Sequence, residues 1–172
     1  MGNDFFLTGY YIMAPFQKIL VAVDRSPVSK HVFAQALALA QVSHATFLLL
    51  SAIELDYGTA SIYPPMYAGG ESITLSQSAM EIYLEQQKQE RAAGLAFLQD
   101  LARQADAVDV VTEISQQFGN PGRSICDVAK TQAVDLIVVG RRGYRGLNEL
   151  WMGSTSNYVV HHAPCSVLVV QS

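Results

Sequence analysis

Residues 134–147 read VDLIVVGRRGYRGL, an apolar, branched run that passes directly into a loop of glycine and arginine. A short run of branched apolar residues is typical of a strand that is buried on both faces of a parallel sheet. In open α/β sheets, ligands bind beyond the carboxyl ends of the strands, which is where this loop lies. The stretch therefore predicts a fold class and the place of a binding site together.

The segments on both sides continue an alternation of strands and helices. Toward the C-terminus, residues 154–161 predict a helix and residues 166–170 (SVLVV) predict the last strand. Such alternation predicts βαβ units with right-handed crossovers, and hence a three-layer, doubly wound α/β fold with a five-stranded parallel sheet. Toward the N-terminus we expect strands at 18–23, 45–53 and 108–115, one helix that begins near Ser26 and a second over 76–105. Gly119, Asn120 and Pro121 mark the turn into a third helix, which runs to about Thr131.

The helix expected at 76–105 combines a polar opening with an apolar stripe near its end. The loop before it, residues 54–75, is longer than typical connections between strands and helices, which indicates a functional or mobile segment. The stripe, spaced for one helix face, consists of Leu95, Leu98, Leu101, Ala102 and Ala105.

Composition bounds the classes of protein that fit this chain. Its 172 residues suit one domain, and half of them are hydrophobic. The formal net charge of −4 provides no basic face for duplex nucleic acid. No run approaches the roughly 18 apolar residues of a membrane helix, and the first basic residue is Lys18, which is unlike a signal peptide. We expect a soluble, cytoplasmic protein without nucleic-acid or membrane partners.

Two cysteines, Cys126 and Cys165, are too few for a disulfide scaffold. They lie in segments that predict a helix and a buried strand, so we expect reduced thiols with a structural role. His161 and His162 lack Cys, Asp or Glu companions at ligand spacing. We therefore predict no metal site.

The glycine loop suits a polyanionic ligand. Gly140 and Gly143 enclose two arginines, and Gly153 with Ser154 follows after nine residues. Glycines allow a close backbone approach, and the amides of the next helix start can bind phosphate. The same glycines could merely turn the chain, and the arginines could be a solvated loop edge. A third glycine followed by serine at this distance favours the phosphate site.

The spacing Gly-x2-Gly-x9-Gly-Ser after the fourth strand resembles the universal stress protein family, in its ATP-binding branch. Residues 18–27 (KILVAVDRSP), 134–147 and 152–170 (MGSTSNYVVHHAPCSVLVV) extend the resemblance. It covers residues 16–171, so we expect a universal stress protein domain at 16–172 after an N-terminal extension at 1–15.

The resemblance implies the strand order 3-2-1-4-5, in an adenine nucleotide alpha hydrolase-like fold that binds ATP with Mg²⁺. Asp24 and Ala52 would border the adenine and ribose, and Gly140 the ribose side. Asp24 could instead cap the first helix, which is a common use of aspartate after a strand. The phosphates would lie against Arg142, Gly143, Gly153, Ser154 and Thr155.

Three functions remain open at this point. The first is a nucleotide-dependent regulator or sensor in stress response, which the resemblance implies, with slow ATP hydrolysis at most and no catalytic residue assigned. The second is an ATP-hydrolysing or nucleotidyl-transfer enzyme of the same fold. The third is a nucleotide-free dimeric interaction module. Neither the stress signal, the protein partners nor the choice among ATP, ADP, AMP and cyclic nucleotides can be read from the residues.

A homodimer is also expected. In the implied strand order, residues 166–170 form an apolar strand at the sheet edge, and an exposed edge invites pairing unless it is covered. Members of the family commonly cover it by pairing across a two-fold axis. We therefore expect a homodimer through the C-terminal strand.

Overall fold

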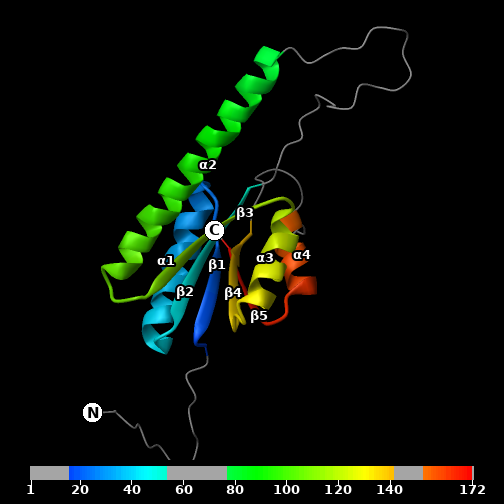
Figure 1. The fold of residues 1–172 in the computed structure, drawn as a ribbon. Coiled ribbons are helices and arrows are strands. Elements are labelled where there is room, and N and C mark those ends of the chain that lie inside the picture. Colours follow the sequence, from blue (N-terminus) through cyan, green and yellow to red (C-terminus); the bar gives the residue numbers. More distant parts are fainter. Residues whose placement is uncertain (1–15, 54–76, 142–152, 172) are drawn as a thin grey trace, which may run out of the picture.

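A computed structural model describes residues 16–53, 77–141 and 153–171, which form one sheet flanked by helices (Figure 1). No helix in these ranges is long and apolar enough to cross a membrane. The elements, in chain order, are β1 (Lys18–Ala22), α1 (Pro27–Ser43), β2 (Thr46–Ile53), α2 (Gln77–Asp106), β3 (Thr112–Phe118), α3 (Pro121–Thr131), β4 (Leu136–Gly140), α4 (Ser154–His162) and β5 (Ser166–Val170).

The five strands form an all-parallel sheet in the order β3-β2-β1-β4-β5. β1 lies at the centre, where Ile19 aligns with Phe47 of β2 on one side and with Leu136 of β4 on the other. The predicted fold class and strand order are therefore confirmed. The winding direction reverses between β1 and β4, which places the expected ligand position at their carboxyl ends.

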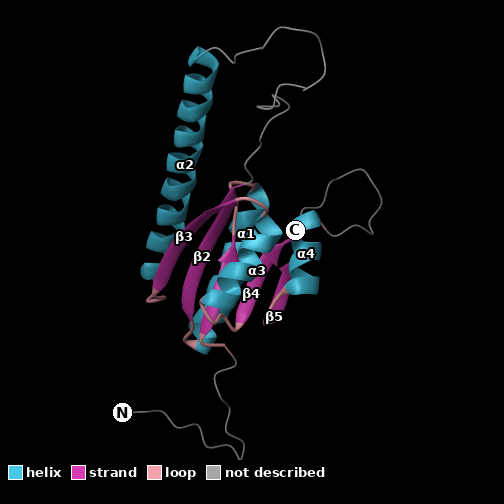
Figure 2. Ribbon diagram, turned by 45° about the vertical axis from the view of Figure 1, so that its right-hand side comes forward, coloured by secondary structure: helices cyan, strands magenta, loops and turns pink. Residues whose placement is uncertain are grey.

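α1 and α2 cover one face of the sheet, and α3 and α4 cover the other (Figure 2). Ile19 and Val21 of β1 pack in one core with residues of α1 and α2, such as Ala36 and Leu98. Leu20 belongs to a second core with residues of α3 and α4. Successive side chains of a strand point to opposite faces, so one apolar run serves both cores.

The helices that follow β1 and β3 begin where local chemistry predicts. Pro27 opens α1 at its first position, where a missing N–H costs nothing. Asn120 caps α3 by accepting a hydrogen bond from the Arg123 amide at 3.0 Å, with Pro121 next in the chain. Both helices start at the carboxyl edge of the sheet, so their N-terminal turns face the expected ligand position.

The start predicted for β3 is wrong by four residues. The chain turns after α2, because the amides of Val108 and Val110 both donate to the Ala105 carbonyl, at 3.1 Å. Asp109 adopts a left-handed conformation with φ of 61°. Val111 is 68% exposed. The alternating sequence of this turn has the period of a strand, and only the hydrogen bonds that end the helix distinguish the two.

Leu95 does not belong to the apolar stripe of α2, because its side chain is 41% exposed. Gly94 takes the place facing the sheet, so close to β3 that a Cβ there would lie 2.4 Å from Nε2 of Gln116. Leu98, Leu101 and Ala105 are buried as predicted. The face of α2 that packs on the sheet therefore includes Gly94 in place of Leu95.

Candidate functional site

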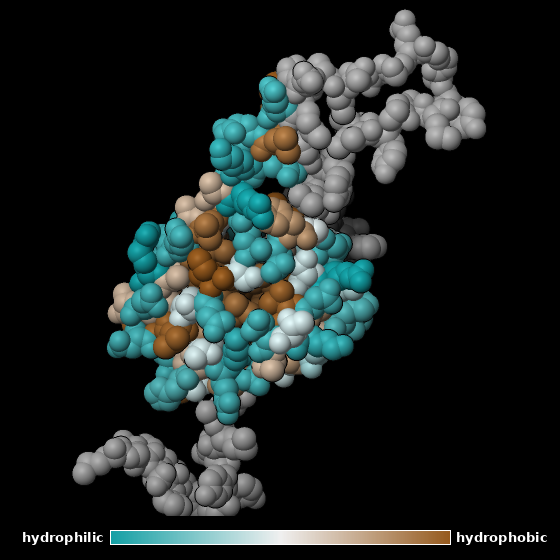
Figure 3. Space-filling view, viewed as in Figure 1, coloured by the Kyte–Doolittle hydropathy of each residue, from teal (hydrophilic) through white to brown (hydrophobic). Residues whose placement is uncertain are grey.

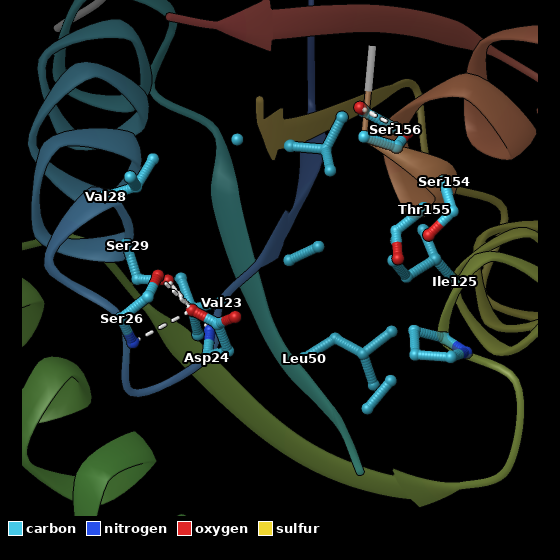
Figure 4. A pocket seen from close by; sticks show the side chains of 16 residues that line it. Val23, Asp24, Ser26, Val28, Ser29, Leu50, Ile125, Ser154, Thr155 and Ser156 are labelled. Carbon is cyan, nitrogen blue, oxygen red and sulfur yellow. Dashed lines mark hydrogen bonds between the residues drawn. The ribbon is translucent and has the colours of Figure 1, made fainter. Parts of the chain in front are cut away.

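A pocket of about 470 Å³ opens at the carboxyl ends of β1, β2 and β4. It lies among the first turns of α1, α3 and α4, which contribute lining residues such as Val28, Pro121 and Thr155. Its volume falls within the range of small-molecule sites. In Figure 4 the residues after β1 and those at the start of α4 face each other across the pocket.

Six of the eight residues predicted for the nucleotide line this one pocket. They come from four parts of the chain, and two further predicted residues, Arg142 and Gly143, lie outside the described residues. The contacts that the resemblance implies for each of them stay predictions. The six are Asp24, Ala52, Gly140, Gly153, Ser154 and Thr155.

The Asp24 carboxylate is held by the turn that enters α1. Its Oδ1 accepts from the Ser26 amide at 3.0 Å, from the Ser26 hydroxyl, and from the Ser29 hydroxyl at 2.8 Å. The Asp24 amide in turn donates to Oγ of Ser29 at 2.8 Å. Asp24 is not the N-cap of α1, which is Ser26, so the alternative role as a helix cap is wrong. Its carboxylate bonds to the turn that enters α1, and the residue lines the pocket.

The opposite wall of the pocket is the N-terminus of α4. Gly153 is the N-cap, with φ of −56° and ψ of 149°, so neither Ser154 nor Thr155 caps this helix. The Ser156 hydroxyl donates to the Gly153 carbonyl at 3.0 Å. The first amides of a helix have no intrahelical partner and carry partial positive charge, which suits an anion. The backbone amides and two hydroxyls of this wall can therefore donate hydrogen bonds to phosphate oxygens.

Gly140 is required by packing at the end of β4. A Cβ at this position would lie 2.8 Å from Cγ2 of Val32 and 3.0 Å from Cγ1 of Val28, both on α1. The close neighbour shown here is a helix of the protein itself, and the place of Gly140 beside a ribose stays a prediction. Among the described glycines, only Gly119 has a positive φ.

Other lining residues that the sequence did not predict include Ser29, Pro121, Ile125 and Ser156, which the fold brings to the pocket. Ser29 lies one turn into α1, and its three-residue spacing from Ser26 is the signal that was available. Pro121 and Ile125, one turn apart at the start of α3, add an apolar wall. Ser156 lies beyond the predicted Gly-Ser motif but on the same first turn of α4.

Two side-chain contacts link α2 to residues near the carboxyl ends of β1 and β3. Arg25, which follows Asp24, forms an ion pair with Glu90 of α2. The guanidinium of Arg91 lies 4.4 Å above the ring of Phe118 at the end of β3. Such exposed pairs contribute little stability.

His162 contacts the preceding turn of α4, and Cys126 and Cys165 are free thiols. The ring of His162 stacks on Tyr158 at 4.0 Å, and its Nδ1 lies 2.8 Å from the Tyr158 carbonyl oxygen. Burial raises the pKa of the Cys126 thiol and of the Cys165 thiol. Within the described ranges, no cluster of three or more His, Cys, Asp or Glu side chains could hold a metal ion.

Comparison with known proteins identifies the relatives of this chain. The model of the universal stress protein family matches residues 15–171. Universal stress protein Sll1388 of Synechocystis is 43% identical over 156 residues, which cover 91% of this chain and 98% of that protein.

Solved structures share the fold. Hypothetical protein MJ0577 superposes with a TM-score of 0.70 at 20% identity, covering 94% of this chain and 98% of its own. A universal stress protein in complex with cAMP gives 0.59 at 20% identity, with 91% and 97% covered. An Arabidopsis thaliana family protein with AMP bound gives 0.60 at 24% identity, with 90% and 91% covered.

Proposed function

The chain belongs to the universal stress protein family, and from this membership and the lining of the pocket we propose that it binds an adenine nucleotide between Asp24 and the start of α4. Two structural neighbours hold AMP or cAMP. The pocket lies where open α/β sheets bind ligands. The proposal extends the chemistry of those neighbours to this chain.

The observation that carries the proposal is that a carboxylate on one wall of the pocket faces hydrogen-bond donors on the other wall. Asp24 supplies a carboxylate, an acceptor for hydroxyl or amino hydrogens of a nucleoside. Gly153, Ser154 and Thr155 supply amides and hydroxyls at a helix start, which are donors for phosphate oxygens. Ala52, Leu50 and Ile125 add apolar surface between them, as a planar base requires. A nucleotide combines these three chemistries in one molecule.

We further propose that the nucleotide is ATP with Mg²⁺ and that the protein acts as a nucleotide-dependent regulator. Phosphoryl transfer requires carboxylates that position a metal and a group that orients the nucleophile. Asp24 is the one carboxylate among the described lining residues, and its Oδ1 already accepts from the α1 turn. Hydrolysis should accordingly be slow, and binding should be the function.

The test is to extract nucleotide from the purified protein and then to titrate ATP, AMP and cAMP with and without Mg²⁺ by calorimetry. Thr155→Val removes one hydroxyl of the pocket while keeping the side-chain shape. Thr131→Val is the matched control, because the Thr131 hydroxyl donates to the Asp127 carbonyl at the far end of α3. We expect weaker binding in the first variant alone. A folded wild type that binds none of the three ligands would refute the proposal.

We also propose a homodimer through β5. This strand lies at the sheet edge and pairs with β4 on its other side. Leu168, in the middle of the strand, is 39% exposed. A second copy of β5 would cover that edge. Light scattering should give twice the chain mass for the wild type and a single chain mass for Leu168→Lys; a monomeric wild type at micromolar concentration would contradict this.

A further inference from the structure

Ser29 stands out as a buried polar residue in the first turn of α1. Only 4% of its surface is exposed, although it lines the pocket. Its hydroxyl donates to Oδ1 of Asp24 and accepts from the amide of the same residue, both at 2.8 Å. A serine hydroxyl has a single hydrogen to donate. Both bonds end on Asp24, so the single hydrogen of this hydroxyl is used on that residue.

The bonds fix the orientation of the carboxylate. Oδ1 accepts from the Ser29 hydroxyl and from the amide and hydroxyl of Ser26. Donors from two positions on one turn of helix hold the same oxygen, so rotation about the Cβ–Cγ bond of Asp24 would break several hydrogen bonds at once. Hydrogen bonds to an ionised group are among the stronger ones in proteins. The direction in which the carboxylate faces the pocket is thereby set by α1.

Helix capping does not account for this arrangement. In a capping box, the residue three positions into the helix reaches back to the N-cap amide. The N-cap here is Ser26, whose side chain makes no capping bond, and the Ser29 amide bonds to the Ser26 carbonyl at 3.2 Å. The Ser29 hydroxyl reaches past the N-cap to Asp24, the second residue beyond the end of β1. It connects the helix to the pocket wall.

We infer that Ser29 is a positioning residue that presents the Asp24 carboxylate to the nucleoside end of the ligand. This inference rests on the proposed nucleotide site, in which Asp24 would bind the nucleoside and the start of α4 the phosphate. The start of α4 lies on the opposite wall of the pocket from Ser29 (Figure 4), where it would bind the phosphate. A ligand with a nucleoside should therefore depend on Ser29, and a ligand made of phosphate alone should not.

The experiment compares Ser29→Ala with Ser43→Ala. Ser43 is the matched control because it lies on the same helix, is also 4% exposed, and donates its hydroxyl to the Leu39 carbonyl at 2.8 Å. AMP and inorganic tripolyphosphate are titrated into both variants and the wild type. We expect Ser29→Ala to weaken AMP about tenfold, as for a lost bond to a charged group. Tripolyphosphate affinity should not change, and Ser43→Ala should leave both affinities at the wild-type values.

Two results would overturn the inference: wild-type AMP affinity in Ser29→Ala, or an equal loss of AMP and tripolyphosphate affinity. If Ser29→Ala does not fold, Ser26→Ala removes one donor to the same oxygen from a half-buried position and should weaken AMP about threefold, with tripolyphosphate unchanged. Wild-type affinity for AMP in that variant would overturn the inference equally.

A measurement without ligand separates this inference from the proposed function. Amide hydrogen exchange of Asp24 should quicken in Ser29→Ala and stay unchanged in Ser43→Ala, because the Ser29 hydroxyl accepts that amide. Unchanged exchange in both variants overturns the positioning role even where nucleotide binds. A wild type that binds neither AMP nor tripolyphosphate overturns the proposed function, and with it the ligand role of Ser29.

Discussion

The two ends of the sheet use polar groups in opposite ways. At the amino end they tie the chain to itself: Oδ2 of Asp135 accepts from the amides of Gln17 and Lys18, each at 2.9 Å. The Thr46 amide donates to the Gln17 carbonyl at 2.8 Å. At the carboxyl end, Asp24, Ser154 and other polar residues line a pocket of about 470 Å³.

The difference follows from helix direction. In a parallel sheet every crossover helix starts at the carboxyl end of one strand and finishes at the amino end of another. The N-terminal turns of α1, α3 and α4 therefore meet around the pocket. The amino end has a second hollow, of about 330 Å³, between the end of α1 and the α2–β3 turn. The C-terminal ends of α1 and α2 lie beside this hollow, and helix C-termini repel anions. A hollow alone therefore does not make a phosphate site.

Filling the carboxyl-end pocket should have the largest effect. Gly153→Val places a branched side chain at the N-cap of α4, next to the amides that face the pocket. We expect nucleotide affinity to fall at least about a hundredfold, or roughly 2.7 kcal/mol, measured by calorimetry. Gln41→Val is the control, because Gln41 lines the amino-end hollow. An equal loss of nucleotide affinity in the two variants would contradict the assignment of the binding site to the carboxyl end of the sheet.

Gly140→Ala tests whether the pocket floor also supports the core. The added methyl group would lie within 3.0 Å of Val32 and Val28 side chains that α1 holds in place. Overpacking of this kind should cost about 1–3 kcal/mol of unfolding free energy in urea titrations. Gly94→Ala is the matched control: its nearest neighbour is the end of the Gln116 side chain, which can move. A Gly140→Ala protein as stable as the wild type would be the contrary result.

Asp135→Ala should separate stability from binding at the amino end. Two backbone amides lose a charged acceptor, so we expect unfolding free energy to fall by about 1–2 kcal/mol, with water offsetting part of the loss. Nucleotide affinity should stay at the wild-type value. Asp135→Asn, which keeps one acceptor oxygen, should lie between the two proteins. A weaker nucleotide affinity in Asp135→Ala would mean that the two ends are coupled.

The smallest effect concerns the two thiols in the layer of α3 and α4. Burial raises the pKa of Cys126, with the neighbouring Asp127 carboxylate adding to it, and burial likewise raises the pKa of Cys165. Because these pKa values are raised, the folded protein holds the thiol protons more tightly than the unfolded chain does. The resulting stabilisation is fully present below the thiol pKa of the unfolded chain and is lost as pH rises through the folded pKa. Iodoacetamide should react more slowly with the folded protein than with the urea-unfolded protein at pH 8. Equal rates would contradict the raised pKa values.

Much of the fold was predictable because its signals are local. The apolar run of β5 and the Asn-Pro start of α3 gave the positions that the structure has, from Ser166 to Val170 and from Pro121 onward. The start of β3 was wrong because the amides of Val108 and Val110 donate to the Ala105 carbonyl of α2, and the alternation of the sequence cannot reveal these bonds. Leu95 was misplaced because the rotation of α2 depends on the close approach of Gly94 to Gln116.

The sequence by itself determined the alternation of strands and helices and marked Asp24 and the Gly-Ser start of α4 as polar groups at strand and helix ends. These features depend on propensity, capping and motif spacing along the chain. Only the tertiary structure decided that Ser29 holds Asp24 and that Ile125 of α3 shares their pocket. Ile125 lies far from Asp24 in the chain, whereas the Ser29–Asp24 bond spans only five residues, between the end of β1 and the first turn of α1. Both depend on how each helix is rotated and seated on the sheet, which packing against side chains of both cores sets.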